Sequence, residues 1–355
     1  MSERFHELDG LRGLAALAVV IYHMTSSYDT FFPGAEPSPI NLWWGMFGVQ
    51  LFFMISGYVI LMSAQRARRP SDFAISRVSR LYPAYWVALI LSIVVSLAFA
   101  VPHEPMTWLD RLLNFTMVQR WFFAPNVDHV YWTLTIELQF YVMVFAMLVL
   151  TRCRLTPRTV TLTVLAWVSV AIIVAIWASP HAHGVNPQLV ATPVKVVLNV
   201  VLAEWAPLFG AGMFAYLGRR DPRYRPAAVA LGAVAAVLAG LLNNWTYASC
   251  VAAMVVVFMV VAFRKRTGLL LTRPVQWYGK ISYSLYIGHS IHGTVVMHLT
   301  MPYLGRVGAM VVAFGAVTLI SWGIHELGEV RGTRALKRFL TSRRAVEPSI
   351  ATHVA

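Results

Sequence analysis

The sequence predicts an all-α, polytopic membrane helix bundle of about ten transmembrane helices with both termini in the cytoplasm. The chain has 355 residues, of which 58% are hydrophobic and only 12% charged. A soluble domain carries about 25% charged residues, so most of this chain is expected to lie in the bilayer. Runs of about 20 mostly apolar residues, the length that spans the hydrocarbon core, occur at 8–28, 43–64, 81–101, 130–150, 159–179, 196–217, 227–242, 245–263, 281–300 and 307–326.

The basic residues predict the orientation of these spans. The net charge is +14, and with the N-terminus inside the cell the cytoplasmic segments hold clusters within 66–80, 152–158, 219–225, 264–280 and 331–344. The outer loops then contain few basic residues, namely Arg111, Arg120, Lys195 and Arg306. This asymmetry follows the positive-inside rule, so the charge reflects topology in the lipid bilayer and no nucleic-acid partner is expected.

The domain organisation predicted is one membrane domain at 1–330 followed by a basic cytoplasmic tail at 331–355. The first apolar run continues past residue 20 with Arg12 inside it, which is typical of a retained span and not of a cleaved signal peptide. The two cysteines, Cys153 and Cys250, are expected in a loop and in a span, and this spacing gives no framework for a disulfide or a metal cluster.

The first span contains two ionisable residues, Arg12 and His23. On an α-helix, eleven residues bring the chain about 20° past three full turns and about 16 Å along the axis. The two side chains are therefore expected on one face at different depths. Because charges inside a span are costly and usually face the bundle interior or a cavity, both are candidates for one internal site.

A pair of arginines, Arg77 and Arg80, follows the second predicted span. Residues three apart are neighbours on a helix, and two guanidinium groups on one face suit phosphate recognition. With Arg12 they could hold a nucleotide-like anionic ligand at the cytoplasmic mouth. The alternative is that the pair only anchors the loop to anionic lipid headgroups.

Three further spans contain polar groups. The second has Ser56 among Gly45, Gly48 and Gly57, which allows either close helix packing or room for a narrow acyl or pantetheine-like group. The fourth has Glu137, expected either as a functional carboxylate or as a partner of a buried base. Asp128 and His129 before it are expected to be solvated loop residues.

The ninth predicted span contains His289 and His292, three residues apart, after Tyr283 and Ser284. Two histidines without a third ligand do not predict a metal site, so no metal is expected. A hydrogen-bonding lining of the cavity is the better interpretation. Glu326, at the end of the tenth span, is expected to neutralise one of the inner arginines.

Five segments together resemble the integral-membrane acyltransferases of acyltransferase family 3. ELDGLRGLAALAVVIYH is similar to the family's opening signature, GVQLFFMISGYVI to its second-span motif and RVSR to its paired arginines. YWTLTIELQFYV and ISYSLYIGHS resemble the segments that carry the glutamate and the ninth-span histidine. Family members O-acylate bacterial surface polysaccharides, lipopolysaccharide, peptidoglycan, Nod factors and some macrolides.

The resemblance implies a multi-pass enzyme of the bacterial inner membrane that uses acyl-CoA, most simply acetyl-CoA, as donor and a saccharide or glycolipid as acceptor. The donor phosphates would contact Arg12, Arg77 and Arg80. His23 would be catalytic, either as a general base or as an acyl carrier, and Glu137 would orient it or assist proton removal. The expected substrate cavity holds Ser56, Tyr283, Ser284 and His289.

The chain departs from the family pattern at two places. HELGEVRG lacks the proline that commonly follows the glutamate, which leaves the role of Glu326 open, and Gly288 stands where a bulky aromatic is common, which would widen the site. The long outer loop at 102–129, with Trp108, Trp121, Phe122 and Phe123, is expected to contact either the acceptor or the membrane interface.

Two other classes of protein remain open at this stage. Intramembrane arginine, histidine and glutamate also mark ion-coupled transporters and flippases, although the sequence lacks paired interrupted spans. A structural partner in polysaccharide assembly is the third class, but it gives no reason for the alignment of Arg12 and His23.

Overall fold

The computed structural model describes residues 5–99, 105–178, 192–264 and 268–350, and these residues form helices and connecting segments without strands. Seven helical segments within these ranges are long and apolar enough to cross a membrane: 43–64, 70–98, 129–150, 157–178, 222–242, 245–263 and 290–342. The predicted all-α polytopic membrane fold is thereby confirmed. The described part does not include Lys265 and Arg266, the start of the 102–129 loop, the end of the predicted tail or the side chain of Lys195.

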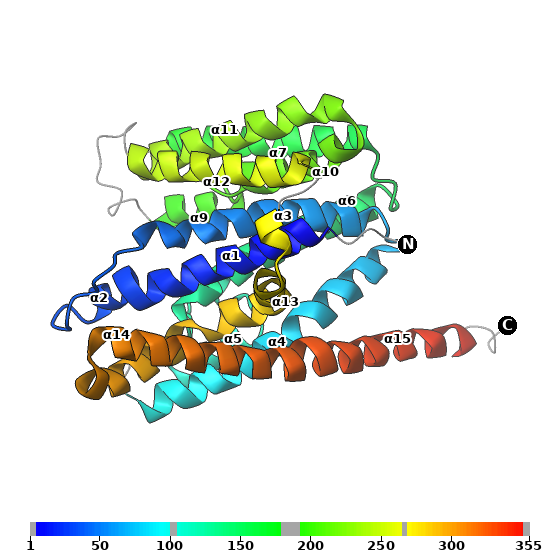
Figure 1. Cartoon of the computed structure of the whole chain (residues 1–355). Coiled ribbons are helices and arrows are strands. Elements are labelled where there is room, and N and C mark those ends of the chain that lie inside the picture. The colour runs from blue at the N-terminus through cyan, green and yellow to red at the C-terminus, as the bar shows by residue number, and fades with distance from the viewer. Residues whose placement is uncertain (1–4, 100–104, 179–191, 265–267, 351–355) are drawn as a thin grey trace. The chain divides into compact units, whose positions relative to one another are not determined.

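The principal helices are shown in Figure 1. They are α1 (His6–Tyr22), α2 (Tyr28–Phe31), α3 (Gly48–Ala64), α4 (Pro70–Ala98), α5 (Trp108–Asn114), α6 (Trp132–Leu150), α7 (Pro157–Ala178), α9 (Thr192–Val200), α10 (Ala206–Arg220), α11 (Arg225–Leu242), α12 (Trp245–Phe263), α13 (Arg273–Gly288), α14 (Ser290–Ile324) and α15 (Thr333–Ile350). Two π-helical segments, His23–Ser27 and His325–Gly332, follow α1 and α14.

Three predicted spans are interrupted. The 8–28 run changes from α-helix to π-helix at His23, and the 196–217 run breaks between α9 and α10, where Leu202 has a positive φ of 53°. The 281–300 run breaks at His289, between α13 and α14. A continuous apolar run predicts that a segment lies in the membrane, but it does not show where contacts from elsewhere in the chain interrupt the helix.

The chain divides into two compact units whose segments alternate along the sequence. The first unit comprises Met1–Val19, Trp44–Ala67 and Val142–Gly279, and the second comprises Val20–Trp43, Arg68–Tyr141 and Lys280–Ala355. The predicted boundary near residue 330, between the membrane domain and the cytoplasmic tail, stays a prediction. The described part of the predicted tail forms α15, which continues the helical run of α14 through the second π-helical segment (Figure 1).

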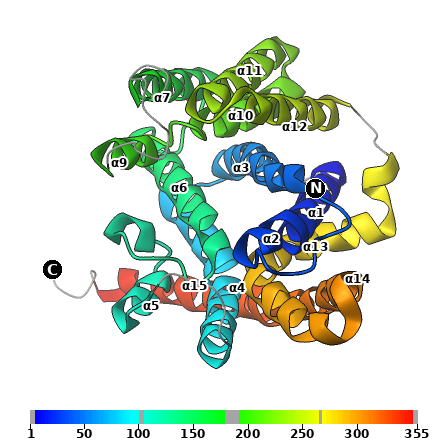
Figure 2. The same ribbon diagram turned by 90° about the vertical axis from the view of Figure 1, so that its left-hand side faces the viewer.

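In the first unit, α7, α10, α11 and α12 lie side by side (Figure 2), and α10 packs on α3. A Cβ atom at Gly57 would lie 2.1 Å from the carbonyl oxygen of Phe209, and one at Gly212 would lie 1.9 Å from that of Met54. Only glycine permits this approach of the two backbones. At Gly57, helix packing is therefore the use that the structure supports.

In the second unit, α4 is the central helix. A Cβ atom at Gly328, in the second π-helical segment, would lie 2.3 Å from the Cα atom of Ala84 on α4. The Tyr85 hydroxyl donates a hydrogen bond to the carbonyl oxygen of Asn114 (2.6 Å), and Trp86 Nε1 donates to that of Phe115 (3.0 Å). The described part of the long predicted outer loop is thus fixed against the middle of α4.

Candidate active site

His23 is the first residue of a π-helical turn that follows α1 directly. A π-helical turn shifts the register of the carbonyl groups and is frequently found at functional sites. The carbonyl oxygens of Met24 and Thr25 in this turn accept hydrogen bonds from Arg306 Nη2, at 3.0 and 3.3 Å. A side chain 283 residues further along the chain therefore stabilises the backbone beside His23.

Arg306 is fully buried, with 1% of its surface exposed. Its Nη2 atom lies 2.6 Å from Asp29 Oδ1, and its guanidinium group lies 4.5 Å from the ring centroid of Tyr28. The preceding residue, Gly305, has a φ of +63° and kinks α14 there. Arg306 was predicted in an outer loop, whereas it lies in α14, and the kink directs its side chain into the protein, where Nη2 is paired and hydrogen-bonded.

His289 lies at the break between α13 and α14 and is 1% exposed. Its Nδ1 atom is 2.7 Å from the carbonyl oxygen of Tyr286, and its Nε2 atom is 3.1 Å from Nδ1 of His23. A carbonyl oxygen only accepts, so Nδ1 of His289 carries the proton and, in the neutral ring, Nε2 is the acceptor. His23 then donates from Nδ1, and its Nε2 atom holds the basic lone pair.

A third histidine, His129, lies beside this pair. The ring centroids of His23 and His129 are 5.0 Å apart, and those of His23 and His289 are 4.8 Å apart. Nδ1 of His129 is 3.3 Å from the hydroxyl oxygen of Ser290, and 47% of the His129 side chain is exposed. His129 is therefore the exposed member of a cluster of three histidine rings around His23.

Asp128 is buried, contrary to the expectation of a solvated loop residue. Its side chain is 0% exposed, and its carboxylate accepts hydrogen bonds from the backbone N–H groups of Val130 (3.3 Å) and Ile291 (3.0 Å). It also lies within electrostatic reach of His289 and His292. Asp128 thus stabilises the start of α14 and places a negative charge near the histidine cluster.

Glu137 lies in a second polar group, with the predicted arginine pair. Tyr141 donates a hydrogen bond to Glu137 Oε1 (2.5 Å), and Arg77 is hydrogen-bonded to the same tyrosine. Arg80 is close enough to Arg77 and Tyr141 to interact with both electrostatically. The structure therefore brings together Glu137, Arg77 and Arg80, and the role of Glu137 in orienting His23 stays a prediction.

The predicted cavity residues of the ninth span have structural partners. The Tyr283 hydroxyl donates to the carbonyl oxygen of Leu81 (3.1 Å), and Ser284 donates to Glu329 Oε1 from its backbone N–H (3.2 Å) and its hydroxyl (2.6 Å). A Cβ atom at Gly288 would lie 2.7 Å from Cδ1 of Ile324. The space that this glycine leaves is thus occupied by a side chain of α14.

Glu329 is a residue that the sequence analysis missed. Besides the two donors of Ser284, Nδ1 of His325 lies 3.2 Å from its Oε1 atom, and Arg80 is within electrostatic reach. Glu326, which was expected to neutralise an inner arginine, is only half-buried. The separation of four residues between His325 and Glu329, which places them on one helix face, was the available signal.

Arg12 and Ser56 belong to the first unit, where both are half-buried. The chain is α-helical from Arg12 to Tyr22, as predicted. Their roles in donor binding and in the cavity stay predictions. Within the described ranges, no group of three or more histidine, cysteine, aspartate or glutamate side chains is arranged to hold a metal ion.

Comparison with known proteins identifies the family. Residues 5–326 match the family model described as "Acyltransferase domain", and the chain belongs to this acyltransferase family. It is 24% identical to the peptidoglycan O-acetyltransferase OatA of Listeria monocytogenes over 90% of this chain and 54% of the relative. It is 26% identical to the acyltransferase MdmB of Streptomyces mycarofaciens over 98% of this chain and 96% of the relative.

The O-acetyltransferase OatA of Staphylococcus aureus is 27% identical over 48% of this chain and 29% of the relative. The chain therefore spans about half the length of the Listeria relative and nearly all of the Streptomyces one. No solved structure matches this chain.

Proposed function

We propose that this protein is a membrane O-acyltransferase that transfers an acyl group, most simply acetyl, from cytoplasmic acyl-CoA to a hydroxyl group of a saccharide or glycolipid at the bacterial inner membrane. Its membership of the acyltransferase family and the printed name of the Listeria relative support the reaction and the saccharide acceptor. The family resemblance suggests Arg12, Arg77 and Arg80 as contacts of the donor, and Arg77 has Glu137 within electrostatic reach.

The observation that carries the proposal is the hydrogen bond between His23 and His289. Because Nδ1 of His289 donates to the Tyr286 carbonyl, Nε2 of His289 accepts a hydrogen bond from the Nδ1–H group of His23, and the basic lone pair of His23 is on Nε2. A general base held in one tautomer accelerates proton transfer by about 10²–10⁴-fold.

In the proposed reaction, Nε2 of His23 takes the proton from the acceptor hydroxyl as its oxygen attacks the thioester carbonyl carbon. The carbon–sulfur bond breaks, and the leaving thiolate takes the proton from His23. During this step His23 is an imidazolium, and the buried carboxylate of Asp128 supplies negative charge near the cluster. His129, which is half exposed and beside His23, is on the side where an acceptor can reach the pair.

The test is acyl transfer by the purified protein in detergent, with radiolabelled acetyl-CoA and with glycolipid extracts or muropeptides as acceptors. The His23→Ala variant is expected to lose transfer while remaining folded, and His298→Ala, an exposed histidine on α14, should retain it. Near-normal transfer by His23→Ala would overturn the mechanism. If the native protein labels none of these acceptors but moves a glycan across vesicles in response to an ion gradient, it is a transporter and the proposal is wrong.

A further inference from the structure

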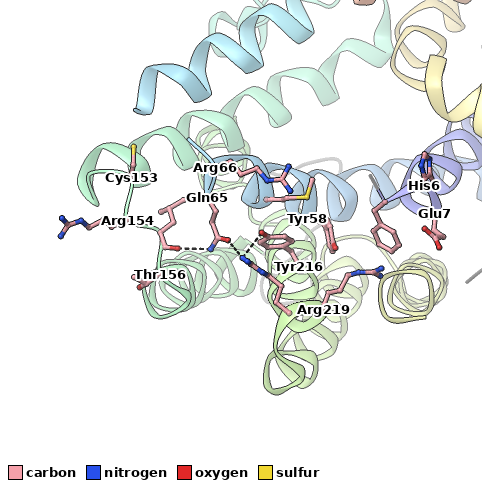
Figure 3. Close-up of a pocket in the computed structure, with 14 residues that line it drawn as sticks. His6, Glu7, Tyr58, Gln65, Arg66, Cys153, Arg154, Thr156, Tyr216 and Arg219 are labelled. Atoms are coloured by element: carbon pink, nitrogen blue, oxygen red, sulfur yellow. Dashed lines mark hydrogen bonds between the residues drawn. The ribbon is translucent and has the colours of Figure 1, made fainter. Parts of the chain in front are cut away.

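The first unit contains a cavity of about 1180 Å³. It is formed by the first residues of α1, the end of α3, the segment between α6 and α7 and the end of α10 (Figure 3). Small-molecule sites in proteins usually have volumes of about 300–1,000 Å³. The cavity is therefore large enough for a ligand of nucleotide size, and the predicted topology places all four segments on the cytoplasmic side.

The cavity is strongly basic. Among the described residues that line it, four are arginines and one, Glu7, is a carboxylate. The arginines are Arg66, Arg154, Arg219 and Arg220. The positive-inside rule requires basic residues near the ends of the spans, but it does not require that residues from three separate segments line one cavity. Such convergence favours an anionic ligand with more than one charge.

Neutral groups hold two of these arginines in position. Nη1 of Arg219 donates to the carbonyl oxygen of Ala262 (3.0 Å), and Nη1 of Arg220 donates to Gln65 Oε1 (3.2 Å) and to the Tyr216 hydroxyl (3.3 Å). Gln65 is itself fixed by donating to the carbonyl oxygen of Leu155 (3.0 Å). A carbonyl, an amide and a phenol orient the guanidinium groups without neutralising their charge, which is the arrangement that suits phosphate binding.

Aromatic rings lie among the arginines. The ring centroids of Phe5 and Tyr58 are 5.8 Å apart, and those of Tyr58 and Tyr216 are 5.3 Å apart. The guanidinium group of Arg219 lies 3.8 Å from the Phe5 ring centroid. Aromatic and guanidinium faces both stack on nucleobases. Arginine side chains that can bind phosphate, next to aromatic rings that can stack on a base, indicate a nucleotide and not an isolated phosphate.

We propose that this cavity is a binding site for a nucleotide with at least two phosphate groups, which under the proposed function is the adenosine 3′,5′-bisphosphate portion of the acyl-CoA donor. Only the identity of the nucleotide rests on the proposed function. This assignment replaces the predicted contact of the donor phosphates with Arg77 and Arg80, which do not line the cavity and have the carboxylates of Glu137 and Glu329 within electrostatic reach.

Equilibrium binding of adenosine 3′,5′-bisphosphate to the full-length purified protein tests the site without requiring acyl transfer. The double variant Arg66→Gln, Arg220→Gln is expected to bind at least tenfold more weakly. Arg158→Gln, an exposed arginine just beyond the lining segment 153–156, should bind as the native protein does. Loss of binding in Arg80→Gln with unchanged binding in the double variant would overturn the proposal in favour of the predicted arginine pair.

Cysteine protection gives a second measurement that does not depend on a folded arginine variant. Cys153 lines the cavity and is half-buried, and Cys250 lies elsewhere, in α12. In a Cys250→Ala background, the nucleotide is expected to slow alkylation of Cys153 by a maleimide at least severalfold. Protection by cardiolipin-containing micelles but not by the nucleotide would show that the site binds lipid headgroups, and the proposal would then be wrong.

The two proposals can fail separately. Nucleotide binding at the cavity without transfer to any acceptor would contradict only the proposed function. Suppose that the native protein transfers acyl groups, that the nucleotide does not protect Cys153 and that the double variant binds the nucleotide normally. These results together would contradict only the cavity assignment.

Discussion

The Nε2 atom of His289 lies 3.1 Å from the Nδ1 atom of His23, and the other nitrogen of His289 is bound to a backbone carbonyl. The two residues are 266 positions apart in the chain, so the fold of the second unit creates this contact. The pair has one consistent arrangement of protons when both rings are neutral, and in it the base is Nε2 of His23.

Replacement of His289 tests this arrangement. His289→Ala removes the acceptor for His23 Nδ1, so we expect kcat to fall by about 10²-fold or more with little change in KM for acyl-CoA. In His289→Gln the amide oxygen can accept the same hydrogen bond, and a larger fraction of kcat should remain. A purely structural role of His289 would instead lower the thermal stability of both variants without separating their kcat values at a permissive temperature.

Asp128 is expected to stabilise the positive charge that forms on His23. Two unit charges about 6–15 Å apart at an effective dielectric constant of about 20 interact with roughly 1–3 kcal/mol, so Asp128→Asn should lower kcat about tenfold or more. The asparagine side-chain oxygen can still accept from the backbone N–H of Ile291, which preserves the start of α14. The measurements are kcat and the thermal-inactivation half-life of the purified variant. An unchanged kcat would contradict the electrostatic role.

The sequence predicted the membrane helices well because hydropathy over about 20 residues depends only on local composition. It did not predict the π-helical turn at His23 or the break at His289, because distant groups contribute to both: Arg306 to the turn, and Asp128, which accepts from the N–H of Ile291, to the start of α14. His23 and His289 were each identified as candidates, but the spacing of residues along the chain does not give the distance between two helices.

Burial of loop residues was the other feature that the sequence did not reveal. Asp128 was expected to be a solvated loop residue and Arg306 to lie in an outer loop, and neither expectation predicted burial. The structure buries them because each has several specific partners. Glu329 was missed for a different reason: a spacing of four residues from His325 does not by itself show that a glutamate contacts Ser284, which is 45 residues away in the chain.

Arg306 is expected to be essential for the local structure around His23. Arg306→Ala removes the side-chain donor to the carbonyl groups of Met24 and Thr25, at a cost of about 1–3 kcal/mol for buried groups, although Thr25 still accepts from the backbone N–H of Tyr28. Asp29, whose side chain is 41% exposed, is solvated when its partner is lost. We expect a shorter thermal-inactivation half-life and a reduced kcat, with partial retention in Arg306→Lys, which keeps the charge but not the planar fork.

The matched control for this prediction is Arg338→Ala, which removes an exposed arginine on α15. It should leave both the half-life and kcat close to those of the native protein. Equal behaviour of Arg306→Ala and Arg338→Ala would contradict the assignment of Arg306 as a positioning residue.

Glu329 and Glu326 offer a comparison within one helical turn. Glu329→Ala leaves the buried backbone N–H and hydroxyl of Ser284 without an acceptor, so we expect a loss of about 1–3 kcal/mol in the free energy of unfolding. Glu329→Gln retains one acceptor oxygen and should lose less. Glu326→Ala, at a half-buried position, should stay within about 0.5 kcal/mol of the native protein. The order of stability of the three variants is measured from their thermal-inactivation half-lives in one detergent. A greater loss in Glu326→Ala than in Glu329→Ala would contradict the assignment of Glu329 as the buried acceptor for Ser284.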